Sequence, residues 1–520
     1  MKPPGQPASP GPALGSGDQI GSTAGQATSP DAAATSGATR KPNPTTSPDA
    51  APDPRRWRAL GVCLAAGCLT MLDVSIVNVA MPSIENALHA GPAALQLIVA
   101  GYTLAIGLVL VPAGRLGDLY GRHRLFVAGV TLFSLMSLGA GLANHQAVLS
   151  GFRLAQGLSA GLLMPQISGL IQQLFRGHER GKAFGLYGAM IGVSTAIGPL
   201  AGGLIISAFG PAHGWRWVFF VNVPIAATVV PLALLWLPRS LGHATRPRFD
   251  LPGVAIIGLA TAAFMVPFVL SGGDTGAANS PHRWWFAGLA VVLAPVLFFW
   301  ERRYQRRHGA AVIDPALIKN PSYLFGAALG MAYFAGFTGI FLVMTLLLQN
   351  GLGYSALQAG AMMMPFAVFS GFSAWRSGHL VQRWGRGLVV GALVLTAMGL
   401  LATDLVLRLV PTHQVWWAVM LAVALAGLGS GSVISPNQVL TLSQVPVAIG
   451  GVAAGVLQTG QRIGSAVGVA VTLARYFVDR ARHDPATAAA NALLISLSLT
   501  VLALVIAVFD AARRHRTDTS

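Results

Sequence analysis

Charged side chains are scarce in this sequence. Only 10% of its 520 residues are Asp, Glu, Lys or Arg, whereas 53% are hydrophobic, and the mean hydropathy is +0.61. A soluble domain usually carries about 25% charged residues. The chain therefore has too little charge to cover a surface in contact with water, and we expect lipid to cover most of it.

Acidic residues are scarcer than basic ones, with 17 Asp and Glu against 34 Lys and Arg and a net charge of +17. A strongly basic chain can indicate nucleic-acid binding. Here the basic residues occur in short segments between long apolar runs, so we expect no nucleic-acid partner. Acids within the apolar runs are few, which gives little support to a pocket selective for cations.

Cysteine and the motifs of soluble enzymes are also scarce. The two cysteines, Cys63 and Cys68, lie five residues apart in one apolar segment. A helix would point them in different directions, so we expect packing residues and no disulfide. The metalloprotease pattern H-E-x-x-H and the Walker phosphate loop are missing from the sequence. We therefore expect no enzymatic activity, no metal site and no cofactor.

Residues 1–54 consist largely of Pro, Gly, Ala, Ser and Thr. Such a segment buries too little apolar surface to offset the conformational entropy of folding, so we expect a disordered cytoplasmic tail. Basic residues at 55–58 separate this tail from the first apolar run. We interpret them as an anchor at the cytoplasmic end of that run; a twin-arginine export signal is the less favoured alternative.

The apolar runs are long enough to cross a membrane. A membrane-spanning helix needs about 20 mostly apolar residues, and fourteen segments meet this requirement. The weakest of them is 284–300, which is short. The fourteen segments are 59–81, 93–113, 125–143, 147–174, 183–208, 217–237, 251–271, 284–300, 322–348, 356–375, 388–408, 415–437, 450–475 and 488–510.

Lys and Arg gather on one side of the membrane when the N-terminus is placed in the cytoplasm. Of the 34 basic residues, 26 then fall on the cytoplasmic side and six on the other, while Arg153 and Arg462 lie within helices. Positive residues prefer the cytoplasmic side of a membrane protein. The distribution predicts a protein of the cell membrane with both termini in the cytoplasm. The basic cluster at 475–482 is the exception to this rule.

The chain contains an internal repeat. Gly378–Arg386 has the same spacing as Gly114–Arg122, and each follows the second helix of a six-helix unit if the seventh and eighth helices are an inserted pair. Transporters built from such related halves hold their substrate between them, near the middle of the membrane. The predicted domains are a tail at 1–54, a six-helix bundle at 55–240, two inserted helices at 241–303, a second six-helix bundle at 304–512 and a tail at 513–520.

Two ionisable residues stand inside predicted helices of the first bundle. Asp73 lies in the first helix and Arg153 near the start of the fourth. A charge at that depth is costly, which makes a functional role the default hypothesis. Asp73 can bind and release a proton or meet a cationic substrate; alternatively, it only hydrogen-bonds to neighbouring helices. Arg153 can pair with Asp73, or it can extend its guanidinium to the outer interface.

The segment 114–124 joins the second and third predicted helices as a tight loop with the spacing G-x-L-G-D-x-x-G-R. Gly114 and Gly121 permit close approach and unusual backbone angles. Asp118 can contact a helix N-terminus or a nearby arginine such as Arg122. An ordinary basic turn is the alternative, which the second copy of the spacing argues against.

Two further segments stand out in later helices. Gly198, Pro199, Gly202 and Gly203 lie in the fifth predicted helix. Small residues let membrane helices approach closely, and a proline removes a backbone hydrogen bond and can kink the helix. Because glycine packing alone is common in membrane helices, simple packing is the alternative.

Arg462, in the thirteenth helix, is best interpreted as a gate contact to the other half.

Together these segments resemble the fourteen-helix drug:proton antiporters of the major facilitator superfamily over residues 58–510. The first-helix segment is close to L-D-x-T-I-V-N-V-A-L-P, with Ser75 and Met81 as substitutions. The sequence departs from the superfamily loop at Leu119 and His123, and the second copy carries Gln382 in place of Asp118. Matching positions are Gly114, Leu116, Gly117, Asp118, Gly121 and Arg122 in the loop, Arg153, Gln156 and Gly157 in the fourth helix, and Gly198, Pro199, Gly202 and Gly203 in the fifth.

The resemblance implies two halves that rock around a central site and couple proton entry to the exit of a small hydrophobic substrate, with a proton gradient in place of a cofactor. By that analogy Asp73, Arg153 and Gln156 carry proton coupling and substrate contact. Asp118 and Arg122 would lock the cytoplasmic gate, and the kink at 198–203 would limit leak. We expect a monomeric multidrug exporter. The alternatives are an exporter of one endogenous metabolite or, less favoured, a scaffold or sensor that transports nothing.

Overall fold

All regular structure in the described part of the chain is helical. The computed structural model describes residues 55–91, 94–95, 97–210, 212–239, 250–269, 281–308, 312–313, 315–411 and 414–518. The predicted tail at 1–54 lies outside these ranges. A helix in lipid satisfies its own backbone hydrogen bonds, which is why long apolar runs fold this way.

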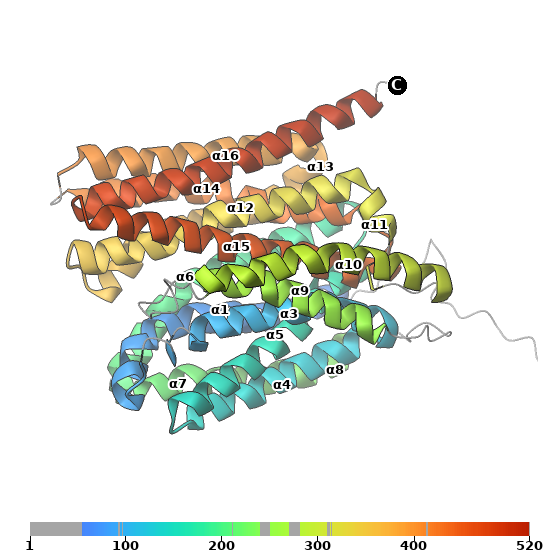
Figure 1. The fold of residues 1–520 in the computed structure, drawn as a ribbon, viewed down its shortest axis with the longest axis horizontal. Coiled ribbons are helices and arrows are strands. Elements are labelled where there is room, and N and C mark those ends of the chain that lie inside the picture. Colours follow the sequence, from blue (N-terminus) through green and yellow to red (C-terminus); the bar gives the residue numbers. More distant parts are fainter. Residues whose placement is uncertain are drawn as a thin grey trace, which may run out of the picture. The chain divides into compact units, whose positions relative to one another are not determined.

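The first half of the chain forms one group of helices and the last third forms another (Figure 1). The first group consists of α1 (Arg56–Leu88), the π-turn η2 (Leu97–Gly101), α3 (Tyr102–Tyr120), α4 (Arg122–Leu142), α5 (Gln146–Leu174), α6 (Gly177–Phe209), α7 (Gly214–Phe220) and α8 (Asn222–Trp236). The second consists of α11 (Pro315–Lys319), α12 (Pro321–Leu346), the π-turn η6 (Leu347–Gly351), α13 (Ala356–Leu409), α14 (Val415–Leu442), the 3₁₀ turn η7 (Val447–Ile449), α15 (Gly450–Arg480) and α16 (Pro485–Asp518).

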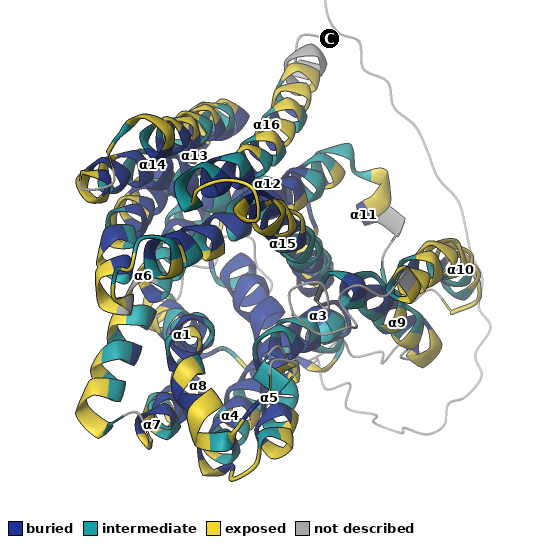
Figure 2. Cartoon of the chain, turned by 60° about the vertical axis from the view of Figure 1, so that its left-hand side comes forward, coloured by how far each residue is buried: buried dark blue, intermediate teal, exposed yellow. Residues whose placement is uncertain are grey.

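Two helices lie between these groups in the chain, α9 (Leu251–Val269) and α10 (Trp284–His308). The 3₁₀ turn η5 (Pro281–Arg283) directly precedes α10. They pack against each other, and α9 also contacts α3 and α15 (Figure 1). The Trp300 indole donates to Asp250 at 3.0 Å and ties the two helices together. Much of α10 is exposed, as Figure 2 shows, with Trp285 77% exposed. An apolar face of this kind requires lipid around it.

Twelve helical segments in the described residues are long and apolar enough to cross a membrane, so the prediction of fourteen is not confirmed. The difference has two sources. The predicted helices 356–375 and 388–408 belong to two helices that meet at Gly385 within the continuous run α13, and this run counts once among the twelve. The predicted helix 450–475 is α15, which is absent from the twelve because its sequence is too polar.

The segment 114–124 is not the loop that the sequence predicts. Residues up to Tyr120 continue α3, α4 begins at Arg122, and Gly121 alone breaks the helix, with φ 99° and ψ 123°. Gly385 holds the equivalent position of the repeat and interrupts α13, with φ 49° and ψ −127°. Positive φ is costly for residues with a Cβ atom, so glycine is required at both breaks.

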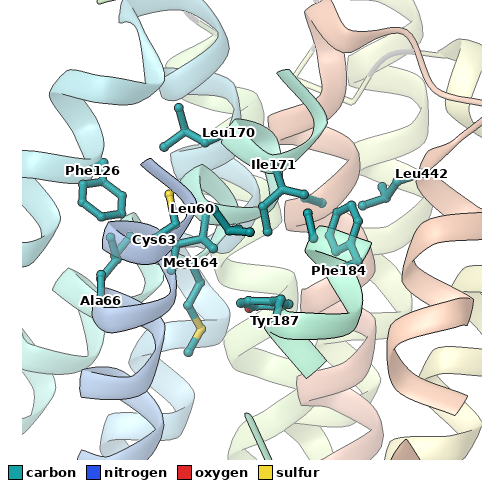
Figure 3. Close-up of a cluster of buried hydrophobic side chains, with 14 of the residues drawn as sticks. Leu60, Cys63, Ala66, Phe126, Met164, Leu170, Ile171, Phe184, Tyr187 and Leu442 are labelled. Carbon is teal, nitrogen blue, oxygen red and sulfur yellow. The ribbon is translucent and has the colours of Figure 1, made fainter. Parts of the chain in front are cut away.

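The helices of the first group pack around apolar side chains. Figure 3 shows the largest cluster, in which Cys63 of α1 lies among Met164 of α5 and Tyr187 of α6. Both cysteines are free, as predicted. Leu442 of α14 belongs to the same cluster, so the apolar contacts continue from the first group of helices into the second.

The basic cluster at 475–482 belongs to a polar network at the ends of α13, α15 and α16. Arg475 pairs with Asp479 at 3.0 Å, and Asn491 donates to Asp479 at 2.8 Å. Arg408 donates to Asn491 at 2.8 Å and pairs with Asp404. Local carboxylates therefore balance Arg408 and Arg475, two of the arginines that the sequence predicts on the side opposite to most basic residues. At the far end of the chain α16 continues to Asp518, beyond the predicted end at 510.

Candidate functional site

Asp73 of α1 lies in a buried polar cluster that joins α1, α5 and α8. Its carboxylate forms an ion pair with Arg153 Nη1 at 2.6 Å and accepts from Gln156 Nε2 at 3.0 Å. Asn222 Nδ2 donates to it at 2.9 Å. None of these four residues is more than 1% exposed. We call Asp73, Arg153, Gln156 and Asn222 the Asp73 cluster.

Arg153 is held on all sides by the protein. Its guanidinium donates to Gln156 Oε1 at 2.7 Å and to the Ile98 carbonyl of η2 at 3.2 Å. The Tyr102 ring lies 4.1 Å from the guanidinium carbon, within cation–π distance. Arg153 does not extend to an interface, the alternative that its position near the start of α5 left open. The pairing with Asp73 is what the structure shows.

Two members of this site were not assigned roles from the sequence. Asn222 stands in the segment that opens the sixth predicted helix, and its amide reaches both Asp73 and Ser137 Oγ at 2.9 Å. Tyr102 supplies the ring beneath Arg153. A polar amide at the start of an apolar run is a usable signal for Asn222. A tyrosine in an apolar helix carries no comparable signal for Tyr102.

The net charge of the Asp73 cluster depends on whether the Asp73 carboxylate carries a proton. With Asp73 ionised, the carboxylate and the Arg153 guanidinium form a neutral pair in a site closed to water. A proton on Asp73 would remove that balance and leave a single positive charge. Breaking a buried pair in this way is costly.

A second polar site lies where α3 meets the start of α15. Asp118 pairs with Arg122 at 2.8 Å and accepts from the backbone N–H groups of Gly451 at 3.1 Å and Val452 at 3.0 Å. A carboxylate at a helix N-terminus satisfies unpaired N–H groups and interacts favourably with the helix dipole. We call Asp118, Arg122, Gly451 and Val452 the Asp118 latch.

Arg122 and Gly114 complete the Asp118 latch. The Arg122 guanidinium also donates to the carbonyls of Gly169 and, at 2.6 Å, of Val447. A Cβ atom at position 114 would lie 2.2 Å from the Gly451 carbonyl oxygen, so only glycine lets α3 and α15 approach so closely. The latch therefore ties helices α3, α4 and α5 to the segment that begins α15.

The second copy of the motif makes a different contact. Arg386 pairs with Asp510 of α16 at 2.5 Å and donates to Asn437 Oδ1 at 2.5 Å. Gln382, at the position of Asp118, is exposed. Gly378 packs instead against α6, where a Cβ atom at Gly181 would lie 2.5 Å from its carbonyl oxygen. The second copy of the motif thus keeps the close contact between helices. It lacks the contact of a carboxylate with a helix N-terminus that Asp118 makes in the first copy.

The glycines of α6 differ in what they contact. A Cβ atom at Gly198 would lie 1.9 Å from Ser75 Oγ of α1, and one at Gly202 would lie 3.1 Å from the Ile76 carbonyl oxygen. A Cβ atom at Gly203 would meet nothing within 4 Å. The close approach of α6 to α1 therefore needs Gly198 and Gly202, and α6 continues through Pro199 as one helix.

We expect Gly198→Ala to destabilise the protein and Gly203→Ala to leave it unchanged. The new methyl group at 198 overlaps Ser75 Cβ and Oγ, and overpacking of this kind costs about 1–3 kcal/mol. The measurement is the thermal unfolding midpoint of both purified variants. Equal midpoints for the two variants would show that α6 and α1 do not pack as described.

Arg462 of α15 contacts the first group of helices. Its guanidinium donates to Met164 Sδ of α5 at 3.6 Å, and the side chain is half-buried. This contact joins the two groups of helices, and the gate role of Arg462 stays a prediction. No group of three or more His, Cys, Asp or Glu side chains is placed to hold a metal within the described ranges.

Comparisons with known proteins identify the family. The family described as Major Facilitator Superfamily matches residues 63–469. A probable actinorhodin transporter of Streptomyces coelicolor is 36% identical over 427 residues, which cover 82% of this chain and 73% of that protein. A puromycin resistance protein of Streptomyces alboniger is 34% identical over 448 residues, which cover 84% and 86%.

The fold of this chain is similar to that of a solved transporter structure. The proton:xylose symporter XylE is 15% identical and aligns with a TM-score of 0.62 over 86% of this chain and 94% of its own. The match to the family covers more than half of the chain, and both relatives are more than 30% identical. This protein is therefore no enzyme but a multi-pass membrane protein that belongs to the Major Facilitator Superfamily of transporters.

Proposed function

We propose that this protein exports hydrophobic drugs or antibiotics across the cytoplasmic membrane in exchange for protons. The observation that carries the proposal is the Asp73 cluster, a fully buried carboxylate whose only charged partner within 4 Å in the described residues is Arg153. Relatives named as a probable actinorhodin transporter and a puromycin resistance protein support transport of compounds of this kind.

The Asp73 cluster and the Asp118 latch have separate roles in this proposal. A proton arriving from outside neutralises Asp73, weakens its pair with Arg153 and favours the state that opens to the cytoplasm. Substrate then binds from the cytoplasm, and release of the proton restores the pair. The Asp118 latch closes the cytoplasmic side in the state that opens outward. Each ligand shifts the equilibrium only by its difference in affinity between the two states.

We further propose that the chain crosses the membrane fourteen times as a monomer, with both termini in the cytoplasm. Gly385 interrupts α13 at the position where Gly121 separates α3 from α4, which supports two crossings within α13. α15 packs against α3 and α12, so its polar residues need not face lipid. These two points add two crossings to the twelve apolar segments.

Transport by purified protein in liposomes tests the proposal. We expect an imposed pH gradient to drive labelled puromycin or a hydrophobic dye across the membrane, and a protonophore to stop it. If no compound in a broad panel moves, the proposal of multidrug export is wrong. A scaffold or sensor would move none of them either in liposomes or in cells.

A narrower function remains the second candidate. The two relatives are each named for one antibiotic, actinorhodin or puromycin, which favours an exporter dedicated to a single metabolite. The same liposome assay separates the two functions, because a dedicated exporter would move one compound class at a rate far above all others.

A further inference from the structure

Arg462 carries a positive charge that the protein does not balance. It lies in the middle of α15, between Gly455, which packs against α3, and Gly464, which packs against α12. Within the described part of the chain no carboxylate lies at ion-pair distance from its guanidinium, whose one hydrogen bond goes to the Met164 sulfur. A charge that is half removed from water and has no charged partner within the protein is costly.

Two buried tyrosines and a methionine surround this charge. Arg462 donates to Met164, and Met164 belongs with Tyr102 and Tyr187 to one cluster of packed buried side chains. The Tyr102 hydroxyl is buried and has no hydrogen-bond partner. Met164 and Tyr187, which Figure 3 shows at the edge of the apolar cluster, are 4% and 6% exposed. A guanidinium and an unpartnered hydroxyl therefore stand together in apolar surroundings.

The nearby acid cannot serve as the missing partner in this state. Asp73 is engaged by Arg153, Gln156 and Asn222, and that pair is neutral as a whole. The surroundings of Arg462 and the Asp73 cluster, taken together, thus carry an excess of one positive charge. They would repel a cationic ligand and attract an anionic one, because opposite charges interact strongly where water is excluded.

We propose that Arg462 and the Tyr102 hydroxyl bind the carboxylate or phenolate of an acidic aromatic substrate. The apolar rings of that substrate would pack against Met164 and Tyr187, since sulfur and tyrosine side chains both make favourable contacts with aromatic rings. This inference rests on the proposed export function and specifies its substrate class. It assigns Arg462 a role in binding, in place of a contact that only closes a gate.

Tyr102 would also connect the substrate to the proton site. Its ring lies against the Arg153 guanidinium at 4.1 Å, while its hydroxyl remains unpartnered. A substrate anion that accepts from this hydroxyl would fix the ring beneath Arg153. Binding at Arg462 and the charge of the Asp73 cluster are then linked through one side chain.

The test compares two dyes that share the xanthene ring system and differ in charge. Fluorescein is anionic at mildly alkaline pH, and its rhodamine analogue is cationic. We expect the purified full-length protein to bind fluorescein about thirtyfold more tightly, and Arg462→Gln to remove that preference, because truncating one partner of a buried charge pair costs at least that much. Fluorescence anisotropy of each dye gives both affinities.

Three variants separate recognition of charge from structure. Arg462→Lys should restore part of the fluorescein affinity, and Tyr102→Phe should lower it about tenfold, the usual contribution of a hydrogen bond to a charged group. Arg408→Gln, which removes an arginine at the end of α13, should change neither affinity. Rhodamine affinity should stay constant throughout the series.

Several results would overturn the inference. These are equal affinities for the two dyes in the native protein, no binding of either dye, or an equal loss of both in Arg462→Gln, which a gate or structural role would produce. The binding assay needs no transport. A charge preference without movement of either dye in liposomes would refute export and keep the site, whereas export without the preference would refute the site alone.

Discussion

Asp73→Asn is expected to reduce efflux driven by a pH gradient to the level of protein-free liposomes, while exchange of substrate across the membrane continues. Asparagine has the shape of a protonated aspartate and can still meet Gln156 and Asn222, but it cannot release a proton. The variant is therefore held in the state with an unbalanced Arg153. Counterflow of labelled substrate, which needs no proton movement, measures the remaining exchange.

The isosteric change matters because larger truncations confound the result. Asp73→Ala would leave Arg153 buried without its partner at a cost of about 3–5 kcal/mol, which can unfold the protein. Asp404→Asn is the matched control, since it removes an acid that pairs with Arg408 at the end of α13. That control should keep coupled efflux. If Asp73→Asn also keeps it, the proton does not bind at this site.

Asp118→Asn is expected to lower the rate of transport about tenfold while substrate affinity changes little. The variant loses the ion pair with Arg122 and the interaction of a negative charge with the start of α15, contributions that together reach about 1–2 kcal/mol. A difference of 1.4 kcal/mol is tenfold in the population of the latched state. Initial rates and equilibrium binding of the same substrate separate the two quantities.

Glu179→Gln provides the comparison for Asp118→Asn. Glu179 pairs with Arg56 at 2.8 Å, but its side chain is 36% exposed, and exposed pairs contribute little. Its removal should leave the transport rate within about twofold of the native value. An unchanged rate in Asp118→Asn, or an equal loss in both variants, would remove the Asp118 latch from the transport cycle.

The residues of both sites could be found from the sequence because each breaks a local rule. Asp73 and Arg153 are charges in apolar helices, and Asp118 lies among glycines whose spacing recurs at 378–386. Their partners could not be found in the same way. The donors to Asp118 are backbone N–H groups of Gly451 and Val452, more than three hundred residues away, and a backbone group leaves no signature.

The helix count shows another limit of sequence reasoning. Apolar windows located the two segments of α13, but they could not show that helical turns reach Gly385 from both sides, so that this one glycine separates the two helices. The same windows included α15, whose Gln458 and Arg462 face other helices and not lipid. Polar residues lower the mean hydropathy of a segment even when the fold buries them against other helices. Composition alone therefore cannot decide whether a helix such as α15 crosses the membrane.

Substrate-induced proton movement in inverted membrane vesicles tests the central claim most directly. The vesicles are energised to establish a pH gradient, a substrate from the panel is added, and a fluorescent probe records the internal pH. The account predicts that substrate dissipates the gradient in vesicles with the native protein and not in those with Asp73→Asn. Substrate transport without proton movement in the native protein, or equal dissipation by both proteins, would contradict it.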